Sequence, residues 1–456
     1  MNPPKPIARP DKVSLWRYLR LFRADILSAQ PARLYRAWMA EYRTPFFRSY
    51  LCNDPTLIEL VLKGRPADFP KSNRVREGLA PLLGRSVFVT NGAEWERQRR
   101  IIDPAFDRGG LRDTFPAMRD AAIAARDRLI ARAGQVVEIE AAASHAAADI
   151  IFRTLFSIPI DHAIAAEVFS LFRAHQSAQP LLNLGAFLPL PRWLPRLHRR
   201  RARVTARRIR QLITRLAEER RAAIEAGRAP ADLATRIMTT PDPVTGQVFD
   251  TAEMVDQVAI FFLAGHETSA AALAWAIYLL AAFPEIQERM AEEVMSLPEN
   301  IDISDISGLI LTRNVFREAM RLYPPVPMMV RETVQAERLR DRIADRGAQI
   351  VISPWHVHRH ERLWDRPDAF DPDRWRTAEG RASARTGYLP FSAGPRVCPG
   401  AGFAMLEGPL LLAVLVRAFR FEVVAGAEPV PVAHLTVRAR EGIRLKVLPR
   451  DTAQPR

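Results

Sequence analysis

The stretch FSAGPRVCPG, residues 391–400, decides how this chain is interpreted. It contains Cys398, one of only two cysteines in 456 residues, the other being Cys52. A lone cysteine is usually a small buried apolar side chain. Here, however, five positions within ten residues carry a specific pattern, namely Phe391, Gly394, Arg396, Cys398 and Gly400. So specific a pattern favours a cysteine with a chemical role.

A cysteine thiolate is a strong ligand for haem iron, and it donates electron density that helps to cleave an O–O bond. The sulfur needs hydrogen-bond donors to hold it, and Gly394 and Gly400 allow backbone amides to approach closely. The planar fork of Arg396 suits a haem propionate, and Phe391 is expected to shield the sulfur side of the ring from water. The apolar segment 402–417 predicts a helix whose N-terminus stabilises the anion.

The composition limits the class of protein. With 48% hydrophobic residues, the chain is long enough to bury a large core. Two cysteines exclude a disulfide framework, a Cys-ligated iron–sulfur cluster and a four-thiolate zinc site, and they indicate a reducing compartment. The first residues, MNPPKPIARPDKVSLW, lack an apolar segment. We therefore expect no signal peptide and no transmembrane anchor there, and a cytoplasmic location.

The net charge of +15 comes mainly from arginine. Such a charge raises the possibility of nucleic-acid binding. The arginines are nevertheless spread along the chain and mixed with acidic residues, and no nucleic-acid motif accompanies them. We expect no nucleic-acid partner, and a basic surface that suits an acidic protein equally well.

The hydrophobic pattern predicts a mainly α-helical protein with a small β part, the α+β class. Helical spacing runs through 114–134, 140–157, 161–178, 196–227 and 251–283, and helices continue to 323. After that, short β-like runs such as AQIVIS, FRFEVV and GIRLKVL alternate with loops, and FFRSYLC near the start is a further candidate strand. We predict an N-terminal extension, 1–29, and one large domain, 30–456. Within that domain, helices dominate 71–323, and strands and loops dominate 324–456.

Residues 258–283 are apolar nearly all round, and their length suits a membrane span. His266 and Glu267 lie near the middle, where ionisable groups are costly in lipid. A helix that is apolar on every side is also typical of the buried axis of a large soluble protein. We favour the buried axis.

The cysteine loop, together with the following GFAMLEG (402–408), resembles the haem-binding signature of the cytochrome P-450 family, the haem-thiolate monooxygenases, in their soluble bacterial form. The resemblance extends over roughly residues 30–445. It implies haem b as the cofactor, Cys398 as the axial ligand of its iron, and a long central helix that lies over the haem.

AGHETS, residues 264–269, resembles the oxygen-activating stretch of that family. The resemblance implies that Ala264 and Gly265 let the haem and O2 approach the backbone, that Thr268 hydrogen-bonds dioxygen or water, and that Glu267 relays protons. The alternative is that Thr268 bonds a carbonyl of its own helix and that Glu267 is a member of a buried pair. Ser269 stands where a second threonine is commoner.

Two further motifs support the resemblance. REAMRLYPPVP (317–327) and WDRPDAFDPDRW (364–375) look like the family's Glu–x–x–Arg helix and its later arginine segment, which implies a buried structural triad of Glu318, Arg321 and Arg374. GAEWERQRR (92–100) looks like its Trp–x–x–x–Arg helix. Asn91 replaces a common aspartate there. The implied propionate ligands are Trp95, Arg99, Arg331 and His358.

The resemblance implies an enzyme that uses O2 and two electrons to hydroxylate a hydrophobic substrate, which is a fatty acid, terpenoid, carotenoid or steroid. No flavin or nicotinamide domain follows the cysteine loop, so electrons are expected from NAD(P)H through a separate reductase and a ferredoxin or flavodoxin. Arg97 and Arg100 are candidates to dock that partner. The alternatives are a peroxygenase or hydroperoxide-rearranging enzyme and, more remotely, a non-catalytic haem sensor.

The stretch 181–203 is apolar and then strongly basic. It suits weak peripheral contact with a membrane, or a loop that caps the substrate pocket before a solvated helix. We expect the protein to be a monomer.

Overall fold

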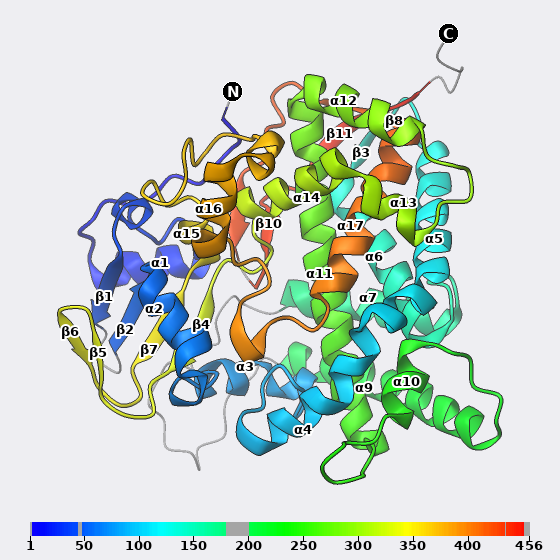
Figure 1. Cartoon of the computed structure of the whole chain (residues 1–456), viewed down its shortest axis with the longest axis horizontal. Helices are drawn as coiled ribbons and strands as arrows, with labels where there is room; N and C mark the ends of the chain where they lie inside the picture. The colour runs from blue at the N-terminus through cyan, green and yellow to red at the C-terminus, as the bar shows by residue number, and fades with distance from the viewer. Residues whose placement is uncertain (1, 44–47, 179–199, 434, 451–456) are drawn as a thin grey trace.

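The computed structural model describes residues 2–43, 48–178, 200–433 and 435–450. Helices form most of the molecule, and strands gather mainly on one side of it (Figure 1). The helices are α1 (Leu15–Ala24), α2 (Pro55–Glu59), α3 (Asn73–Leu83), α4 (Gly92–Ile102), α5 (Arg108–Ile130), α6 (Ile139–Phe156), α7 (Ala163–Ala178), α9 (Arg200–Glu225), α10 (Leu233–Thr239), α11 (Thr251–Ala282), α12 (Pro284–Met295), α13 (Ile303–Gly308), α14 (Ile310–Leu322), α15 (Pro354–Val357), α16 (Ala378–Gly387) and α17 (Ala401–Ala418). This balance confirms the mainly α-helical class.

The strands form small sheets. They are β1 (Met39–Arg43), β2 (Arg48–Cys52), β3 (Val136–Glu138), β4 (Met329–Glu332), β5 (Glu337–Leu339), β6 (Arg342–Ala344), β7 (Gln349–Ile352), β8 (Phe419–Val423), β9 (Pro431–Ala433), β10 (Val437–Ala439) and β11 (Arg444–Pro449). One sheet has the order β1-β2-β7-β4, with β2 and β7 parallel and the other pairs antiparallel. A second has the order β3-β11-β8. The four runs predicted as strands therefore became β2, β7, β8 and β11.

Helix α11 is the axis of the helical part (Figure 1), and it packs against α6, α9, α14 and α17. It begins with a capping box, in which Asp250 and Glu253 exchange side-chain-to-backbone hydrogen bonds. It ends before Pro284, whose ring cannot continue a helix interior. Both α11 and α17 are apolar and long enough to cross a membrane, but 72% and 67% of their apolar windows are buried in the protein. The predicted buried axis is confirmed.

The N-terminal extension packs onto the main body. Pro3 and Pro6 are buried, and the hydroxyl of Tyr323 donates a 2.8 Å hydrogen bond to the carbonyl of Pro4. The backbones of Arg9 and Pro31 form an isolated parallel β-bridge. The first residues thus lie over the region that contains the LYPPVP segment. The proposed division of the chain at residue 29 stays a prediction.

Candidate active site

The cysteine loop joins a single-turn helix, Gly394–Arg396, to the start of α17. The amide of Cys398 donates a 2.9 Å hydrogen bond to the carbonyl of Phe391, and the amide of Gly400 hydrogen-bonds the sulfur. Gly400 caps α17, so the sulfur lies beside the amide end of a long helix, as the sequence predicted. These contacts hold one sulfur atom in a defined position.

The two cysteines differ in access to solvent. Cys52 is fully buried, and burial raises the pKa of its thiol to about 12. Cys398 is exposed, although the surrounding protein still raises its pKa by desolvation. The Gly400 amide and the nearby Arg99 oppose that rise, because both stabilise the thiolate. Only Cys398 of these two is available as a ligand.

Gly394 has a backbone reason to be glycine. Its φ is +69°, which side chains other than hydrogen rarely tolerate. A Cβ atom at this position would also overlap the carbonyl oxygen of Leu62. The glycine therefore seats the cysteine loop against the segment Leu60–Gly64 rather than contributing a contact of its own.

The central segment of α11 has a buried face and an open face. Ala264, Gly265, Thr268 and Ser269 are half-buried, whereas His266 is buried. The hydroxyl of Thr268 donates a 2.5 Å hydrogen bond to the carbonyl of Ala264. This hydrogen bond is the alternative that the sequence analysis gave for Thr268, in which the hydroxyl bonds a carbonyl of its own helix. The hydroxyl can bond another group only after the side chain rotates.

Gly265 is required for helix packing. A Cβ atom there would collide with the Cδ1 atom of Ile151 on α6, and α6 and α11 form the most extensive helix contact in the structure. The sequence interpretation placed the haem against this glycine. The structure adds a separate reason for a glycine at this position, which is the close approach of α6.

Glu267 is tied to the β9–β10 hairpin. Its Oε1 atom accepts a 2.7 Å hydrogen bond from the Thr436 hydroxyl and a 2.8 Å hydrogen bond from the Arg438 guanidinium. The side chain of Arg438 is 39% exposed, whereas that of Glu267 is 7% exposed. The pair therefore connects the buried centre of α11 with the surface. Sequence reasoning anticipated a buried pair but had no signal for its partner, which lies 171 residues away.

A second carboxyl group, which the sequence analysis did not single out, lies beside the same part of α11. The hydroxyl of Ser269 donates a 2.6 Å hydrogen bond to Oε2 of Glu407 on α17. Glu407 is fully buried, and burial raises its pKa to about 8. Its other oxygen, Oε1, has no hydrogen-bond partner among the described residues. Glu407 is thus a neutral acid at pH 7 that joins the two long apolar helices.

The predicted structural triad is formed as expected. Arg321 binds Glu318 through two hydrogen bonds of 2.8 and 2.9 Å, and Arg374 binds the same carboxylate at 2.9 Å. Glu318 and Arg321 are completely buried. Arg321 also donates to the carbonyls of His358, Pro367 and Ala369, which satisfies its three remaining donors. Helix α14 is thereby locked to the segment that precedes the cysteine loop.

His358 lies in this network and not at an anion site. Its Nδ1 atom bonds the carbonyl of Arg321 at 3.2 Å, and its Nε2 atom accepts a 2.7 Å hydrogen bond from the amide of Leu389. Burial lowers its pKa to about 3, so the ring is neutral. The predicted propionate contact is therefore corrected: both ring nitrogens bind the protein, and His358 links the triad to the cysteine loop.

Cationic side chains converge on Trp95, which is buried. The ring lies 5.5 Å from Lys71 Nζ, 5.9 Å from the Arg99 guanidinium and 5.3 Å from the Arg396 guanidinium. Arg99 also donates a 2.6 Å hydrogen bond to the carbonyl of Val397, next to Cys398. Arg331 belongs to the same cluster, since it lowers the pKa of Lys71 by charge repulsion. Sequence reasoning identified all but Lys71.

The cluster has an excess of positive charge. Burial, aided by three neighbouring cations, lowers the pKa of Lys71 to about 6. Burial, together with the smaller repulsion of Arg396, lowers the pKa of Arg331 to about 10. The Nε atoms of Arg331 and Arg396 are buried without a hydrogen-bond partner among the described residues. Arg99 pairs with Asp103, but the arrangement as a whole suits a buried dianion.

Arg97 and Arg100 do not lie free beside this cluster. Arg97 pairs with Glu253 at 2.5 Å, and Arg100 pairs with Asp242 at 2.5 Å. These ion pairs fasten α4 to the first turn of α11 and to the segment between α10 and α11. The two arginines are therefore engaged within the protein, which weakens their assignment as docking residues for a partner.

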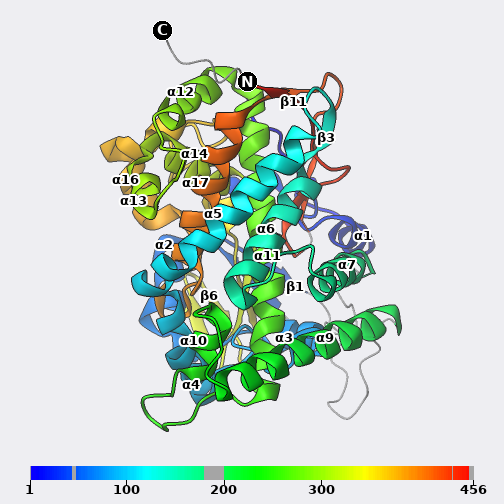
Figure 2. The same cartoon turned by 90° about the vertical axis from the view of Figure 1, so that its right-hand side faces the viewer.

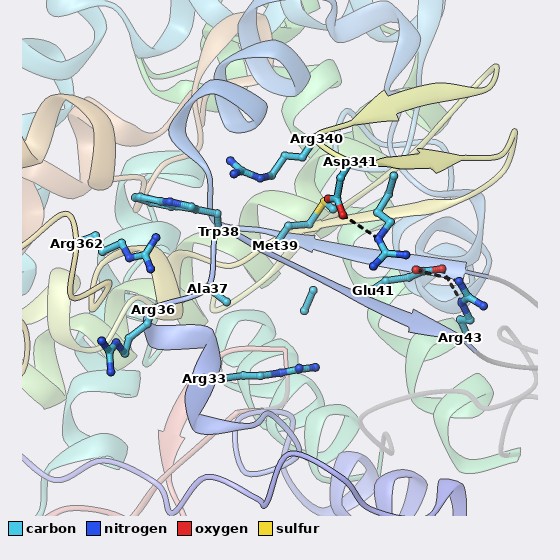
Figure 3. Close-up of a pocket in the computed structure, with 12 residues that line it drawn as sticks. Arg33, Arg36, Ala37, Trp38, Met39, Glu41, Arg43, Arg340, Asp341 and Arg362 are labelled. Atoms are coloured by element: carbon cyan, nitrogen blue, oxygen red, sulfur yellow. Dashed lines mark hydrogen bonds and ion pairs between the residues drawn. The ribbon is translucent and has the colours of Figure 1, made fainter.

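A separate cavity of about 620 Å³ lies in the β-rich part, between β1 and the β5–β6 hairpin (Figure 3). Six arginines line it, but most are paired: Arg43 with Glu41 at 2.8 Å, Arg342 with Asp341 at 3.3 Å, Arg340 with Asp54, and Arg36 with Glu361 at 3.1 Å. The guanidinium of Arg362 lies 5.5 Å from the Trp38 ring. None of the predicted site residues lines this cavity, so it is distinct from the candidate active site.

Comparison with known proteins covers almost the whole chain. The family model described as Cytochrome P450 matches residues 33–447. The chain is 32% identical over 421 residues to the cyclooctat-9-en-7-ol 5-monooxygenase of Streptomyces melanosporofaciens, covering 91% of this chain and 87% of that protein. It is 29% identical over 431 residues to a cytokinin hydroxylase of Arabidopsis thaliana, covering 91% and 83%.

Two further comparisons agree. The chain is 29% identical over 413 residues to the 11-oxo-beta-amyrin 30-oxidase of Glycyrrhiza uralensis, covering 86% of this chain and 77% of that protein. Among solved structures, the crystal structure of the cytochrome P450DA heme domain superposes with a TM-score of 0.83 at 22% identity, over 99% of each chain. At that identity the likeness shows the fold alone.

Proposed function

Because the chain belongs to the cytochrome P450 family and is a monooxygenase of that family, we propose that it hydroxylates a terpenoid-like substrate with O2 and two electrons delivered by separate redox proteins. The observation that carries the chemistry is the accessible Cys398, whose sulfur is hydrogen-bonded by the Gly400 amide at the start of α17. Each further step rests on what the surrounding side chains do.

Family membership implies a haem, and the residues present fit one. When bound, a thiolate-ligated haem supplies the redox chemistry with which O2 is activated. Cys398 would ligate its iron, and the cluster of Lys71, Arg331 and Arg396 would hold its two carboxylates. The buried and unpartnered Nε atoms of Arg331 and Arg396 are the donors that such a dianion would satisfy.

Proton supply is assigned to Glu267 and Thr268. Glu267 holds its carboxylate between the exposed side of Arg438 and the centre of α11, so it can take up a proton near the surface and release it inside. Rotation of the Thr268 side chain would free its hydroxyl from the Ala264 carbonyl and turn it to the open face of the helix. The two residues then act in series, with Glu267 as proton donor and Thr268 as hydrogen-bonding group.

The substrate class is inferred from relatives. Two of them, at 32% and 29% identity, have names that describe oxidation of terpenoid-like compounds. Of the fatty-acid, terpenoid, carotenoid and steroid classes that the sequence left open, we therefore propose the terpenoid class.

The electron donor is proposed to dock where the cysteine loop reaches the surface. Val397 is exposed there, next to Cys398. Lys63 is also exposed and lies beside the loop, since a Cβ atom added to Gly394 would touch its backbone. The first turn of α5 adds the exposed Arg108 and Arg112, and their neighbour Leu111 lies close to Gly402. These cations, rather than Arg97 and Arg100, suit an acidic ferredoxin or flavodoxin.

The test combines turnover with a spectrum. Purified protein, supplied with NADPH, a reductase and a ferredoxin, is incubated under 18O2 with panels of terpenoid alcohols and fatty acids, and products are identified by mass spectrometry. A product that carries one 18O atom from a terpenoid alone supports the proposal. Preference for fatty acids would overturn the substrate class, and turnover with hydrogen peroxide but not with the redox partners would favour the peroxygenase alternative.

We also propose a cytoplasmic, monomeric protein. The segment 181–203, proposed as a weak membrane contact, lies largely outside the described residues, and that contact stays a prediction.

A further inference from the structure

We infer that the outer face of α1 binds the surface of a membrane that contains anionic lipids. This α1 basic face consists of Trp16, Arg17, Arg20 and Arg23, all of which are exposed. Trp16 is 84% exposed, which is exceptional for the largest apolar side chain. The inference is independent of the segment 181–203.

The helix is held firmly to the protein by its opposite face. The ring of Tyr18 stacks on that of Tyr42 in β1 at 6.0 Å and contacts Phe22 at 5.6 Å. The side chain of Ser14 caps the helix by accepting from the amide of Arg17. The orientation of α1 is thereby set, and its outward face is a fixed feature of the surface rather than a fraying end.

The outward arginines have no internal counter-charge. In the part of the chain that the structure describes, no carboxylate forms an ion pair with Arg17, Arg20 or Arg23, and α1 itself contains no acidic residue. The surrounding sequence is also unbalanced. Residues 1–48 contain ten Lys and Arg but only three Asp and Glu, so about half of the net charge of +15 lies in the first tenth of the chain. An anionic surface is the complement of this face.

Lipid fits this face better than another polyanion because of Trp16. An indole ring has an apolar body and a polar N–H group, and it favours the boundary between headgroups and acyl chains. Positions 16, 20 and 23 share one face of a helix, so the ring and two guanidinium groups would meet the same plane. Each basic side chain near an anionic membrane strengthens binding about fivefold, and a tryptophan inserted into the interface adds buried apolar area.

A second element lies on the same side of the molecule. Figure 2 shows α1 and the starting end of α9 together on the right-hand side. Near that end, Val204 is 61% exposed and Arg207 is also exposed. Two elements on this side of the molecule therefore carry exposed basic and apolar side chains. If the proposed function holds, this side would bring the enzyme to the phase in which an apolar substrate dissolves.

The experiment is co-sedimentation of the full-length haem-loaded protein with vesicles. Vesicles of phosphatidylglycerol and phosphatidylcholine are compared with vesicles of phosphatidylcholine alone, at low and at physiological salt. The test variants are Trp16→Ala and the triple variant Arg17→Gln, Arg20→Gln, Arg23→Gln. The matched control removes three exposed arginines near α16, which Figure 2 places on the opposite side, namely Arg376→Gln, Arg381→Gln and Arg385→Gln. Unchanged circular dichroism and CO spectra show that each variant is folded.

We expect the wild-type protein and the control to bind anionic vesicles in a salt-sensitive manner. The triple variant should bind roughly tenfold or more weakly, and Trp16→Ala should lose the blue shift in fluorescence that accompanies insertion of the indole. Equal binding to neutral vesicles, or anionic binding by the triple variant at wild-type strength, would overturn the inference. Retention of DNA at physiological salt without vesicle binding would also overturn it. These readouts require no substrate turnover, so they can fail or succeed separately from the proposed function.

Discussion

The guanidinium of Arg438 donates a 2.8 Å hydrogen bond to the carboxylate of Glu267, which joins the β9–β10 hairpin to the centre of the longest helix. The carboxylate that we propose to pass protons inward is thereby held in one place by an ion pair. This ion pair is expected to set how well Glu267 is positioned for that role.

Arg438→Gln therefore tests the proton supply. Loss of the cation leaves the Glu267 carboxylate less well positioned, so product formation should fall and the fraction of O2 released as peroxide should rise. Glu267→Gln removes the proton donor and should lower product formation by about 100-fold. Arg440→Gln, an exposed charge next to the same hairpin, is the matched control. If Glu267→Gln is impaired but Arg438→Gln releases no more peroxide than the wild-type protein, Arg438 has no positioning role.

The two cysteines give a second prediction. Cys398→Ala should abolish the red-shifted Soret band of the reduced, CO-bound protein, because the thiolate opposite CO is lost. Cys52→Ala should keep that band, since Cys52 is the last residue of β2 and is fully buried. A preserved red-shifted band in Cys398→Ala would contradict the assignment of the ligand.

Removal of Glu318 is expected to be severe. Glu318→Gln leaves Arg321 and Arg374 buried without a counter-charge, and breaking a buried pair in this way costs about 3–5 kcal/mol. We expect little folded, haem-loaded protein, measured by thermal unfolding and haem content. Glu225→Gln has the same Glu–x–x–Arg spacing with Arg228 but lies on the surface, and it should change stability by less than about 0.5 kcal/mol. Comparable stability of the two variants would argue against the triad as a structural lock.

Glu407 predicts a pH dependence of stability. Its pKa rises from 4.5 to about 8 in the folded protein, so between those values the native state binds a proton that the unfolded state has released. This contribution is complete below about pH 4.5 and is lost as the pH rises towards 8. Glu407→Gln keeps the neutral hydrogen-bonding group and should remove this slope. Denaturant unfolding from pH 5 to pH 8.5 compares the two proteins, and identical slopes would show that Glu407 is ionised in the native state.

Lys71 is expected to help to retain the haem. A dianion beside the ammonium group would restore its charged form, which burial and, to a lesser degree, the neighbouring cations now oppose. Lys71→Met should therefore release haem several-fold faster to a scavenger protein. The exposed Lys63→Met is the control for loss of a lysine near the cysteine loop. Equal haem loss from both variants would place Lys71 outside the haem site.

Much of the fold could be predicted because its signals are local. The apolar stretch that became α11, the helix after Cys398 and the runs that became β2, β7, β8 and β11 are contiguous in sequence, and hydrophobic periodicity reports them directly. The Glu318–Arg321 pair is local too, since its members lie three residues apart on one helix. Arg374 was found through its motif, not through spacing.

What could not be predicted are contacts between distant segments. Arg438 reaches Glu267, Glu407 reaches Ser269, and Lys71 joins the cluster at Trp95, each across more than twenty residues of sequence. No periodicity encodes such pairings, because they depend on how helices and hairpins pack. The same packing moved His358 from an expected anion site into the backbone network of Arg321, and it engaged Arg97 and Arg100 in ion pairs.

The kind of chemistry could be inferred from the order of residues alone. One cysteine lies in a glycine-framed loop, an apolar helix has a polar centre, and Glu318 pairs with Arg321, and each of these features lies within a short stretch. The groups that control that chemistry became apparent from the packing of distant segments. They are the cation that holds Glu267 and the acid that stays neutral beside Ser269. The same packing leaves the tryptophan and arginines of α1 exposed to solvent. Burial and proximity fix the charge and availability of a side chain, and both are properties of the packed molecule rather than of the order of its residues.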